Sequence, residues 1–284
     1  MITTISNSIL SVTIDSKGAE LQSLQNVSSK REYIWEGNPE YWGKHSPVLF
    51  PIVGTLKNNS YHYQNKSYKL SRHGFARDMD FKLISSENNK VVFSLQCNEA
   101  TKQAFPFEFE LLVTYLLVDA ELTITYTVIN QGKGVMPYSI GGHPAFALND
   151  SFEKYSLQFE TDEKLLSYAL ENDLLSENKR EIQLNTGRLP LAYSLFERDA
   201  LIFKSLSSKQ IQIFENEVPL LNFKFSGFPN FGIWTKKNAP FICLEPWAGY
   251  SDTLAASGNI IEKEGIQLLA GKSSQEYRFS IEII

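Results

Sequence analysis

The chain has 284 residues, of which 43% are hydrophobic and 21% charged, and this balance excludes a disordered protein because it suffices to bury a sizeable core. A net charge of −5 gives no electrostatic footprint for nucleic acid, and no basic run predicts a role at a membrane surface. Two cysteines, Cys97 and Cys243, are too few for a disulfide-dense scaffold, and both lie in apolar runs that predict buried free thiols. Met1–Leu10 lacks the charged and apolar regions of a signal peptide, and no apolar run approaches the ~20 residues that span a bilayer. We therefore expect a soluble, cytoplasmic protein.

Strand-like runs dominate the chain from its start to its end. In chain order they are Leu10–Ile14, Glu20–Leu24, Tyr61–Tyr63, Ser67–Leu70, Asp80–Ile84, Val91–Cys97, Phe107–Val118, Glu121–Ile129, Lys154–Phe159, Ala200–Phe203, Ile211–Phe214, Leu220–Phe225, Phe231–Trp234, Phe241–Leu244 and Tyr277–Ile284. Polar or Gly/Pro punctuation between these runs predicts an all-β sandwich or barrel, and the absence of βαβ alternation argues against a doubly wound fold. With no linker or repeat visible, we expect one domain over residues 1–284.

Short connections and two ambiguous segments complete this outline. Asp119-Ala120 and Gln64-Asn65-Lys66 each separate two strand-like runs and predict hairpins. Asn98–Phe105 predicts one or two helical turns that end at Pro106. Thr161–Leu175 contains good helix formers, but its periodicity does not distinguish helix from strand.

The first chemically interesting cluster is Ser71–Asp78, which reads SRHGFARD. His73 with Arg72 and Arg77 provides many hydrogen-bond donors in a chain that is acidic overall, and donors without acceptors suit hydroxyl-rich or anionic ligands. The alternative is a loop whose arginines pair with Asp78, Asp80 or other surface carboxylates, and the sequence leaves both open.

The second cluster surrounds His143 in the segment Ser139–Phe146, which reads SIGGHPAF. The two glycines before it allow close backbone approach or a positive φ, and Pro144 restricts His143 to extended conformations. A histidine held in this way suits proton transfer, although a structural turn with an incidental histidine explains the segment equally well. His45 and His62 carry no such context, and no local spacing typical of metal ligands occurs, so we expect no metal.

The third cluster, Leu244–Asp252, follows directly on an apolar strand-like run and reads LEPWAGYSD. Aromatic faces such as that of Trp247 pack against the C–H faces of sugars, while a carboxylate such as that of Glu245 accepts hydrogen bonds from their hydroxyls. A glutamate at a strand end is often merely solvated, so this cluster gains weight only together with the other two.

Four segments, taken together and in this order, resemble the aldose 1-epimerase (galactose mutarotase-like) family. They are Pro47–Gly54, His73–Asp78, Gly142–Phe146 and Glu245–Trp247. The resemblance implies an all-β supersandwich of two large antiparallel sheets with few short helices, and strands or irregular structure over Thr161–Leu175. It also implies a cofactor-independent isomerase that acts on a small-molecule sugar or sugar phosphate, without nucleic acid or membrane partners.

The family resemblance assigns expected roles to seven residues. His143 matches the general acid and Glu245 the general base, and the substrate-binding groups are expected to be His73, Arg77, Arg72, Asp199 and Trp247. These roles fit the interconversion of α and β anomers, in which a base takes the proton of the C1 hydroxyl and an acid protonates the ring oxygen.

The sequence also departs from the family pattern. Thr55 stands where many relatives have arginine, and Lys57 nearby could supply only a point charge in its place. The segment Glu245–Trp247 differs from the Glu-Thr-Gln of galactose mutarotases, which leaves the sugar open. A non-catalytic carbohydrate-binding or sugar-sensing protein on the same scaffold is the main alternative, and a glycoside hydrolase using Glu245 and Asp252 is a weaker one.

Overall fold

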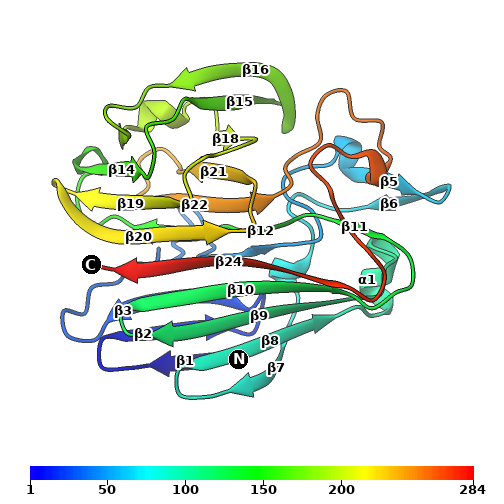
Figure 1. Cartoon of the computed structure of the whole chain (residues 1–284), viewed down its shortest axis with the longest axis horizontal. Helices are drawn as coiled ribbons and strands as arrows, with labels where there is room; N and C mark the ends of the chain where they lie inside the picture. Colours follow the sequence, from blue (N-terminus) through cyan, green and yellow to red (C-terminus); the bar gives the residue numbers. More distant parts are fainter.

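The computed structural model describes all of residues 1–284 and contains two large antiparallel sheets. The strands of the nine-stranded sheet follow one another down Figure 1, with β14 and β19 near the top and β7 at the bottom. In spatial order they are β17 (Arg188–Pro190), β14 (Tyr155–Phe159), β19 (Gln210–Glu215), β20 (Val218–Ser226), β24 (Ser274–Ile283), β10 (Glu121–Asn130), β9 (Phe109–Val118), β8 (Lys90–Gln96) and β7 (Lys82–Ser86).

The eight-stranded sheet carries most of the segments that the sequence analysis singled out. In spatial order its strands are β16 (Leu174–Ile182), β15 (Leu165–Glu171), β18 (Leu201–Phe203), β21 (Asn230–Trp234), β22 (Phe241–Ala248), β12 (Ile140–Gly142) and β4 (Val48–Leu49), with β13 (Ala145–Ala147) also paired to β22. Strand β22 is buried along its whole length, which is why it reads as a continuous apolar run interrupted only by Glu245 and Pro246.

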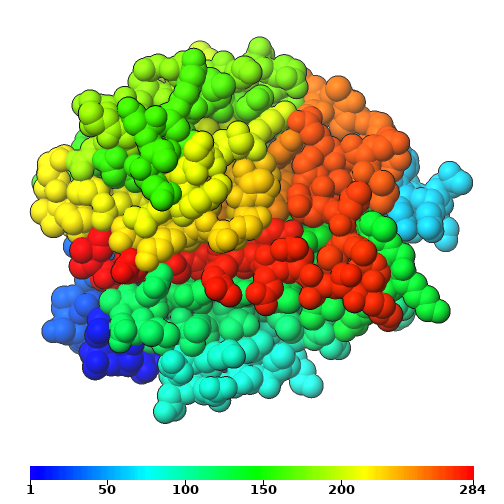
Figure 2. All heavy atoms as spheres, viewed as in Figure 1, coloured from blue at the N-terminus to red at the C-terminus, as the bar shows by residue number.

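Smaller elements surround these sheets. They are the three-stranded sheet β1 (Ile2–Ser6), β2 (Leu10–Asp15) and β3 (Glu20–Asn26), the pair β11 (Met136–Tyr138) and β23 (Gln267–Leu269), and the hairpin β5 (Ser60–Tyr63) and β6 (Lys66–Lys69). This last hairpin projects from the body of the molecule, as the cyan segment at the right of Figure 2 shows. The helices are α1 (Glu99–Ala104) and the 3-10 turns η1 (Lys57–Asn59), η2 (Ala76–Asp78), η3 (Phe152–Lys154), η4 (Tyr193–Phe196) and η5 (Ile260–Glu262). None of the helices is long and apolar enough to cross a membrane.

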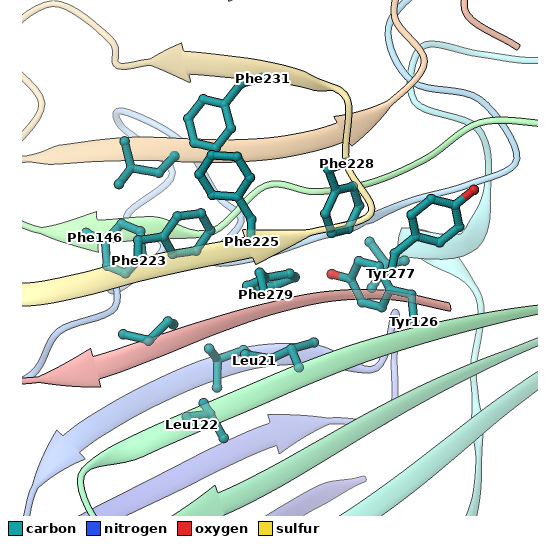
Figure 3. Packing of buried hydrophobic residues seen from close by; sticks show 14 of the residues in the cluster. Leu21, Leu122, Tyr126, Phe146, Phe223, Phe225, Phe228, Phe231, Tyr277 and Phe279 are labelled. Carbon is teal, nitrogen blue, oxygen red and sulfur yellow. The ribbon is translucent and has the colours of Figure 1, made fainter. Parts of the chain in front are cut away.

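The two large sheets pack face to face through aromatic side chains. Phe225 of β20 lies against Phe231 of β21 with ring centroids 4.6 Å apart, and Phe223 of β20 lies 5.6 Å from Phe146 of β13. Figure 3 shows these rings between strands of the two sheets. Alternate residues of β9 and β10 point into the same core of 61 buried residues, as their period-two pattern requires. The all-β sandwich predicted from the sequence is confirmed.

Local predictions were mostly confirmed as well. Both expected hairpins form, as β9–β10 and β5–β6, and Asn98 caps α1 with a reciprocal capping box. Thr161–Leu175 forms β15 and the start of β16, so the strands implied by the family resemblance are confirmed there. The prediction of two buried thiols was wrong for Cys97, which is only partly buried because it lies just past the end of β8, whereas Cys243 is fully buried.

Candidate active site

A cavity of about 360 Å³ lies at the eight-stranded sheet and brings together all seven residues that the sequence predicted for the site. Its walls are formed by Trp42, Gly54, Arg72, His73, Arg77, His143, Leu170, Asp199, Ala200, Ile202, Trp234, Glu245, Trp247 and Ser251. The volume is at the small end of the range of ligand sites and suits a small molecule.

Strand pairing places His143 beside Glu245. His143 lies between β12 and β13, and both of these strands pair with β22, through Ile140 opposite Ala248 and Ala145 opposite Cys243. As a result Nε2 of His143 lies 3.2 Å from Oε2 of Glu245. Both side chains are at least nine-tenths buried, so a small cavity presents an acid–base pair that is almost shielded from bulk water.

The glycines around this pair are required by close packing. A Cβ atom on Gly141 would lie 2.6 Å from Cδ1 of Trp247, and one on Gly232 would lie 2.5 Å from Cη2 of the same ring. On Gly142 a Cβ would come 2.9 Å from Phe279. The sequence left two explanations open for the glycine pair Gly141-Gly142, close backbone approach and a positive φ. Close approach is the one observed, and it holds the Trp247 ring between β12 and β21.

His73 is held by the loop that contains Gly54. The backbone N–H of His73 donates to the carbonyl of Gly54 at 2.8 Å, and the N–H of Gly54 donates to Nδ1 of His73 at 3.1 Å. His73 and Gly74 both have positive φ, and Gly74 lies so close to the carbonyl of Phe50 that a Cβ would clash. This turn explains the His-Gly pair in the sequence.

Both ring nitrogens of His73 face hydrogen-bond donors. Burial, with nearby His143 and the two arginines, holds the pKa of His73 well below its ordinary value, which favours the neutral ring. Arg72 Nε donates to Nε2 at 3.3 Å and the Gly54 N–H donates to Nδ1 at 3.1 Å. Because a neutral imidazole accepts at only one nitrogen, these two donors compete for His73, and its other nitrogen carries the proton.

The arginines line the cavity and also brace its edge. Arg72 forms an ion pair with Asp173 at 3.1 Å, in the turn between β15 and β16. Arg77 donates to the carbonyl of Arg72 at 2.9 Å, and its Nε lies 3.6 Å from Asp78. The two alternatives that the sequence left open therefore coexist, because each guanidinium group contacts a carboxylate while facing the cavity.

Burial dominates the electrostatics of the acid–base pair. Loss of water raises the pKa of Glu245 well above its ordinary range, with Arg72 opposing the effect and Asp199 adding to it. The same burial lowers the pKa of His143 well below 6.5, and Arg72 and Arg77 lower it further. Burial therefore favours the uncharged form of both residues.

Four buried polar atoms on side chains that line this cavity have no hydrogen-bond partner. They are Nε of Arg77, Nδ1 of His143, Oε2 of Glu245 and Nε1 of Trp247. Although Oε2 lies close to the His143 ring, the contact does not have hydrogen-bond geometry. Buried polar groups are satisfied almost everywhere in folded proteins, so a group of four such atoms on one cavity points to a polar ligand.

Two tryptophans complete the walls and were missed by the sequence analysis. Trp42 stacks on the His143 ring with centroids 4.7 Å apart and an angle of 28°, and Trp234 stands edge-on to His143 at 5.9 Å. Trp42 lies in a loop far from His143 in the chain, with no motif around it. Trp234 ends a predicted strand, and only its pairing with Cys243 on β22 reveals its position.

The structure does not support two alternatives that involve charged residues. Lys57 does not line the cavity, because its Nζ donates to the carbonyl of Leu254 and its backbone N–H to Asp252. It therefore does not replace the arginine absent at Thr55. Asp252 is buried in an ion pair with Lys263 at 3.1 Å and faces away from the cavity, so the pair of Glu245 and Asp252 needed for a glycoside hydrolase does not form there.

One cluster could hold a metal ion, although no local spacing in the sequence indicated it. The ligand atoms of His143, Cys243 and Glu245 all lie within 4.8 Å of one another, and all three residues are buried. Cys243 and Glu245 alternate on β22 and so share a face. Sequence spacing could not find this cluster, because His143 comes from a different strand pair.

Comparison with known proteins shows to which family the chain belongs. The family model described as aldose 1-epimerase matches residues 1–280. Protein LacX (chromosomal) of Lactococcus lactis subsp. lactis is 35% identical over 273 residues, which cover 91% of each chain, and the plasmid-encoded Protein LacX of the same organism gives the same values.

Solved structures show the same relationship at the level of the fold. The structure of a galactose mutarotase related enzyme from Lactobacillus acidophilus superposes with a TM-score of 0.95 at 32% identity, covering 100% of this chain and 97% of that one. A galactose mutarotase-like protein from Lactobacillus casei gives 0.95 at 31% identity with full coverage of both chains. On the match of the family model over almost its whole length, the chain belongs to the aldose 1-epimerase family.

Proposed function

We propose that this protein is a mutarotase that interconverts the α and β anomers of a hexose, with Glu245 as general base and His143 as general acid. The observation that carries the proposal is the 3.2 Å separation of His143 Nε2 and Glu245 Oε2, two side chains that are at least nine-tenths buried, on one wall of a small cavity. Membership of the aldose 1-epimerase family supports the same reaction type. General acid–base catalysis needs both groups within hydrogen-bond reach of the substrate atoms.

The two neutral residues give the proposed reaction a defined cycle. Across their 3.2 Å separation a small reorientation on substrate binding aligns the two groups, so that a proton passes from Glu245 to His143 and creates a carboxylate and an imidazolium. The carboxylate takes the proton of the C1 hydroxyl, the imidazolium protonates the ring oxygen, and the C1–ring oxygen bond breaks to leave an aldehyde. Both residues are then neutral again, which is the state that burial favours. The aldehyde rotates about C1–C2, and the reverse transfers close the ring to either anomer.

The remaining cavity residues fit the binding of a hydroxyl-rich ring. The His73 imidazole lines the cavity, and Asp199 accepts a hydrogen bond at 2.7 Å from the N–H of Ala200, which holds its carboxylate at the cavity wall. The faces of Trp42 and Trp247 suit the apolar C–H faces of a sugar. The orphaned indole N–H of Trp247 offers one more donor.

We propose a neutral hexose, in preference to a hexose phosphate, as the substrate. Arg72 and Arg77 are the cationic side chains on the cavity, and each already contacts a carboxylate, of Asp173 and Asp78 respectively. A phosphate would have to displace these partners before it could bind a guanidinium group in a bidentate manner.

The direct test is anomer exchange measured by magnetisation-transfer NMR on a panel of free and 6-phosphorylated aldoses at equilibrium. We expect acceleration over the buffer rate for at least one free hexose, unchanged by a metal chelator because the cycle uses only side-chain protons. The alternative is a carbohydrate-binding protein without catalysis. Saturable binding of a sugar with no acceleration of its anomer exchange would establish that alternative and overturn our proposal.

A further inference from the structure

The acid–base pair has a third neighbour that the proposed cycle does not use. The sulfur of Cys243 lies with the ligand atoms of His143 and Glu245 in a group whose members are all within 4.8 Å of one another. Strand β22 holds Cys243 and Glu245 on one face, and the pairing of Cys243 with Ala145 brings His143 to the same place. The backbone therefore fixes all three side chains, which is what a preformed metal site requires.

We propose that His143, Cys243 and Glu245 form a binding site for Zn²⁺. Thiolate, imidazole and carboxylate are the ligand types that zinc takes, and three protein ligands with one open position are typical of its accessible sites. Tetrahedral bonds of about 2.0–2.3 Å put neighbouring ligand atoms about 3.3–3.7 Å apart. The His143–Glu245 separation of 3.2 Å already matches this spacing, and the sulfur needs to move inward by about 1 Å.

The unpartnered carboxylate oxygen of Glu245 is a second observation in favour of the site. Oε2 of Glu245 is buried without a hydrogen-bond partner, on a side chain that is 2% exposed. A metal ion would supply the partner that this oxygen lacks. On binding, the proton of the Cys243 thiol and the proton of the Glu245 carboxyl group are released to water, so that two anionic ligands neutralise the dication.

The chemistry of the cluster also discriminates between cations. His143 and Glu245 line the cavity, which gives an ion its entry path and leaves the fourth position for water. Arg72 and Arg77 on the same cavity repel cations, so an ion must gain strong bonds to nitrogen and sulfur. Mg²⁺ and Ca²⁺ prefer oxygen ligands and do not gain this from a thiolate and an imidazole.

Zinc at this site would occupy both atoms that transfer protons and would therefore inhibit anomer exchange. This consequence rests on the proposed function, whereas the binding of zinc does not. Cys243 would then be the metal ligand that makes anomer exchange sensitive to zinc.

Binding is tested with Co²⁺ as a spectroscopic probe and with Zn²⁺ by titration calorimetry on the full-length apoprotein. We expect a thiolate-to-cobalt charge-transfer band in the wild type, absent from Cys243→Ala, and zinc binding at least tenfold weaker in that variant. Cys97→Ala is the matched control, and it should keep both signals. Cys243→Ser replaces the alanine variant if circular dichroism shows that Cys243→Ala is not folded. No band in the wild type, or an unchanged band in the folded Cys243 variant, would overturn the site.

Anomer exchange with and without Zn²⁺ separates this inference from the proposed function. We expect Zn²⁺ to inhibit the wild type and Cys97→Ala reversibly, and Cys243→Ala to be at least tenfold less sensitive. Equal inhibition of Cys243→Ala would count against the site. If the wild type binds zinc through Cys243 but catalyses no exchange with any aldose, the metal site stands and the mutarotase proposal fails.

Discussion

Replacing Glu245 by glutamine should abolish catalysis and stabilise the fold at the same time. The carboxyl side chain is 2% exposed, and its Oε2 has no hydrogen-bond partner. Glutamine has nearly the same volume, cannot accept the C1 hydroxyl proton, and carries an amide that can donate to Nε2 of His143. We therefore expect anomer exchange to fall by about 10²–10⁴-fold, the usual contribution of a general base, while sugar binding survives.

The stability gain should depend on pH with a defined sign. Burial raises the pKa of Glu245 in the folded protein above the value of 4.5 for an unperturbed carboxyl. Between these two values the folded state holds a proton that the unfolded state has released, so the stability of the wild type falls as pH rises. Each pH unit in this window costs about 1.4 kcal/mol, and the glutamine variant has no such cost. Within this window the melting temperature of the variant should exceed that of the wild type by about 3 °C more for each further pH unit.

Thermal denaturation between pH 4.5 and 8 measures this difference. Glu20→Gln is the matched control, because the carboxylate of Glu20 is also buried but accepts hydrogen bonds from the backbone of His45 and Ser46 at 2.7 and 3.1 Å. That variant should be less stable than the wild type. A Glu245→Gln protein that melts several degrees below the wild type at pH 7, or that keeps normal exchange, would refute the reasoning.

The rate of anomer exchange should not change at the ordinary histidine pKa near 6.5. Burial keeps His143 neutral above and below this pH, so the protonation of the pair does not change there. A wild-type rate that halves near pH 6.5 would contradict this. Trp42→Ala should slow exchange by up to about tenfold by removing the ring stacked on His143, whereas Trp42→Phe should restore most of the rate. Gly232→Ala should destabilise the protein by about 1–3 kcal/mol and weaken sugar binding, since its Cβ would lie 2.5 Å from the Trp247 ring; unchanged melting and affinity would show that the ring is not held there. Arg77→Ala should leave the ratio of affinities for a free hexose and its 6-phosphate unchanged at low salt, and a preference for the phosphate that this variant abolishes would make Arg77 a phosphate ligand.

The fold was predictable from the sequence because strand periodicity survives burial on one face. The alternation of Leu122, Ile124, Tyr126 and Val128 identified β10 directly, and all four side chains point into the core. The same reasoning did not decide whether Thr161–Leu175 forms a helix or a strand. In the fully formed sheet β15 is half-buried and irregular, with a register shift between Tyr168 and Leu170, so no period dominates its sequence.

The residues of the candidate site also divide into those that the sequence indicated and those that it did not. His143 was found because the glycines and the proline around it record a backbone constraint, and His73 because it lies in a cluster of hydrogen-bond donors with Arg72 and Arg77. Trp42 and Cys243 were not, because nothing in their local sequence reflects contacts that form only when distant strands pair. Lys57 was misjudged for the opposite reason, since closeness in sequence to Thr55 suggested a shared surface, but its side chain turns toward Leu254.

The most direct test of the central claim is the rate of anomer exchange, by magnetisation-transfer NMR, catalysed by His143→Asn on the best aldose of the panel. Its control is calorimetric binding of the same sugar. The acid–base account predicts a folded variant that binds the sugar with similar affinity and loses at least a hundredfold in exchange rate. Combining it with Glu245→Gln should cost little more, because the two residues act as one unit. A folded His143→Asn protein with near-wild-type exchange would show that His143 is not the acid and would contradict the account.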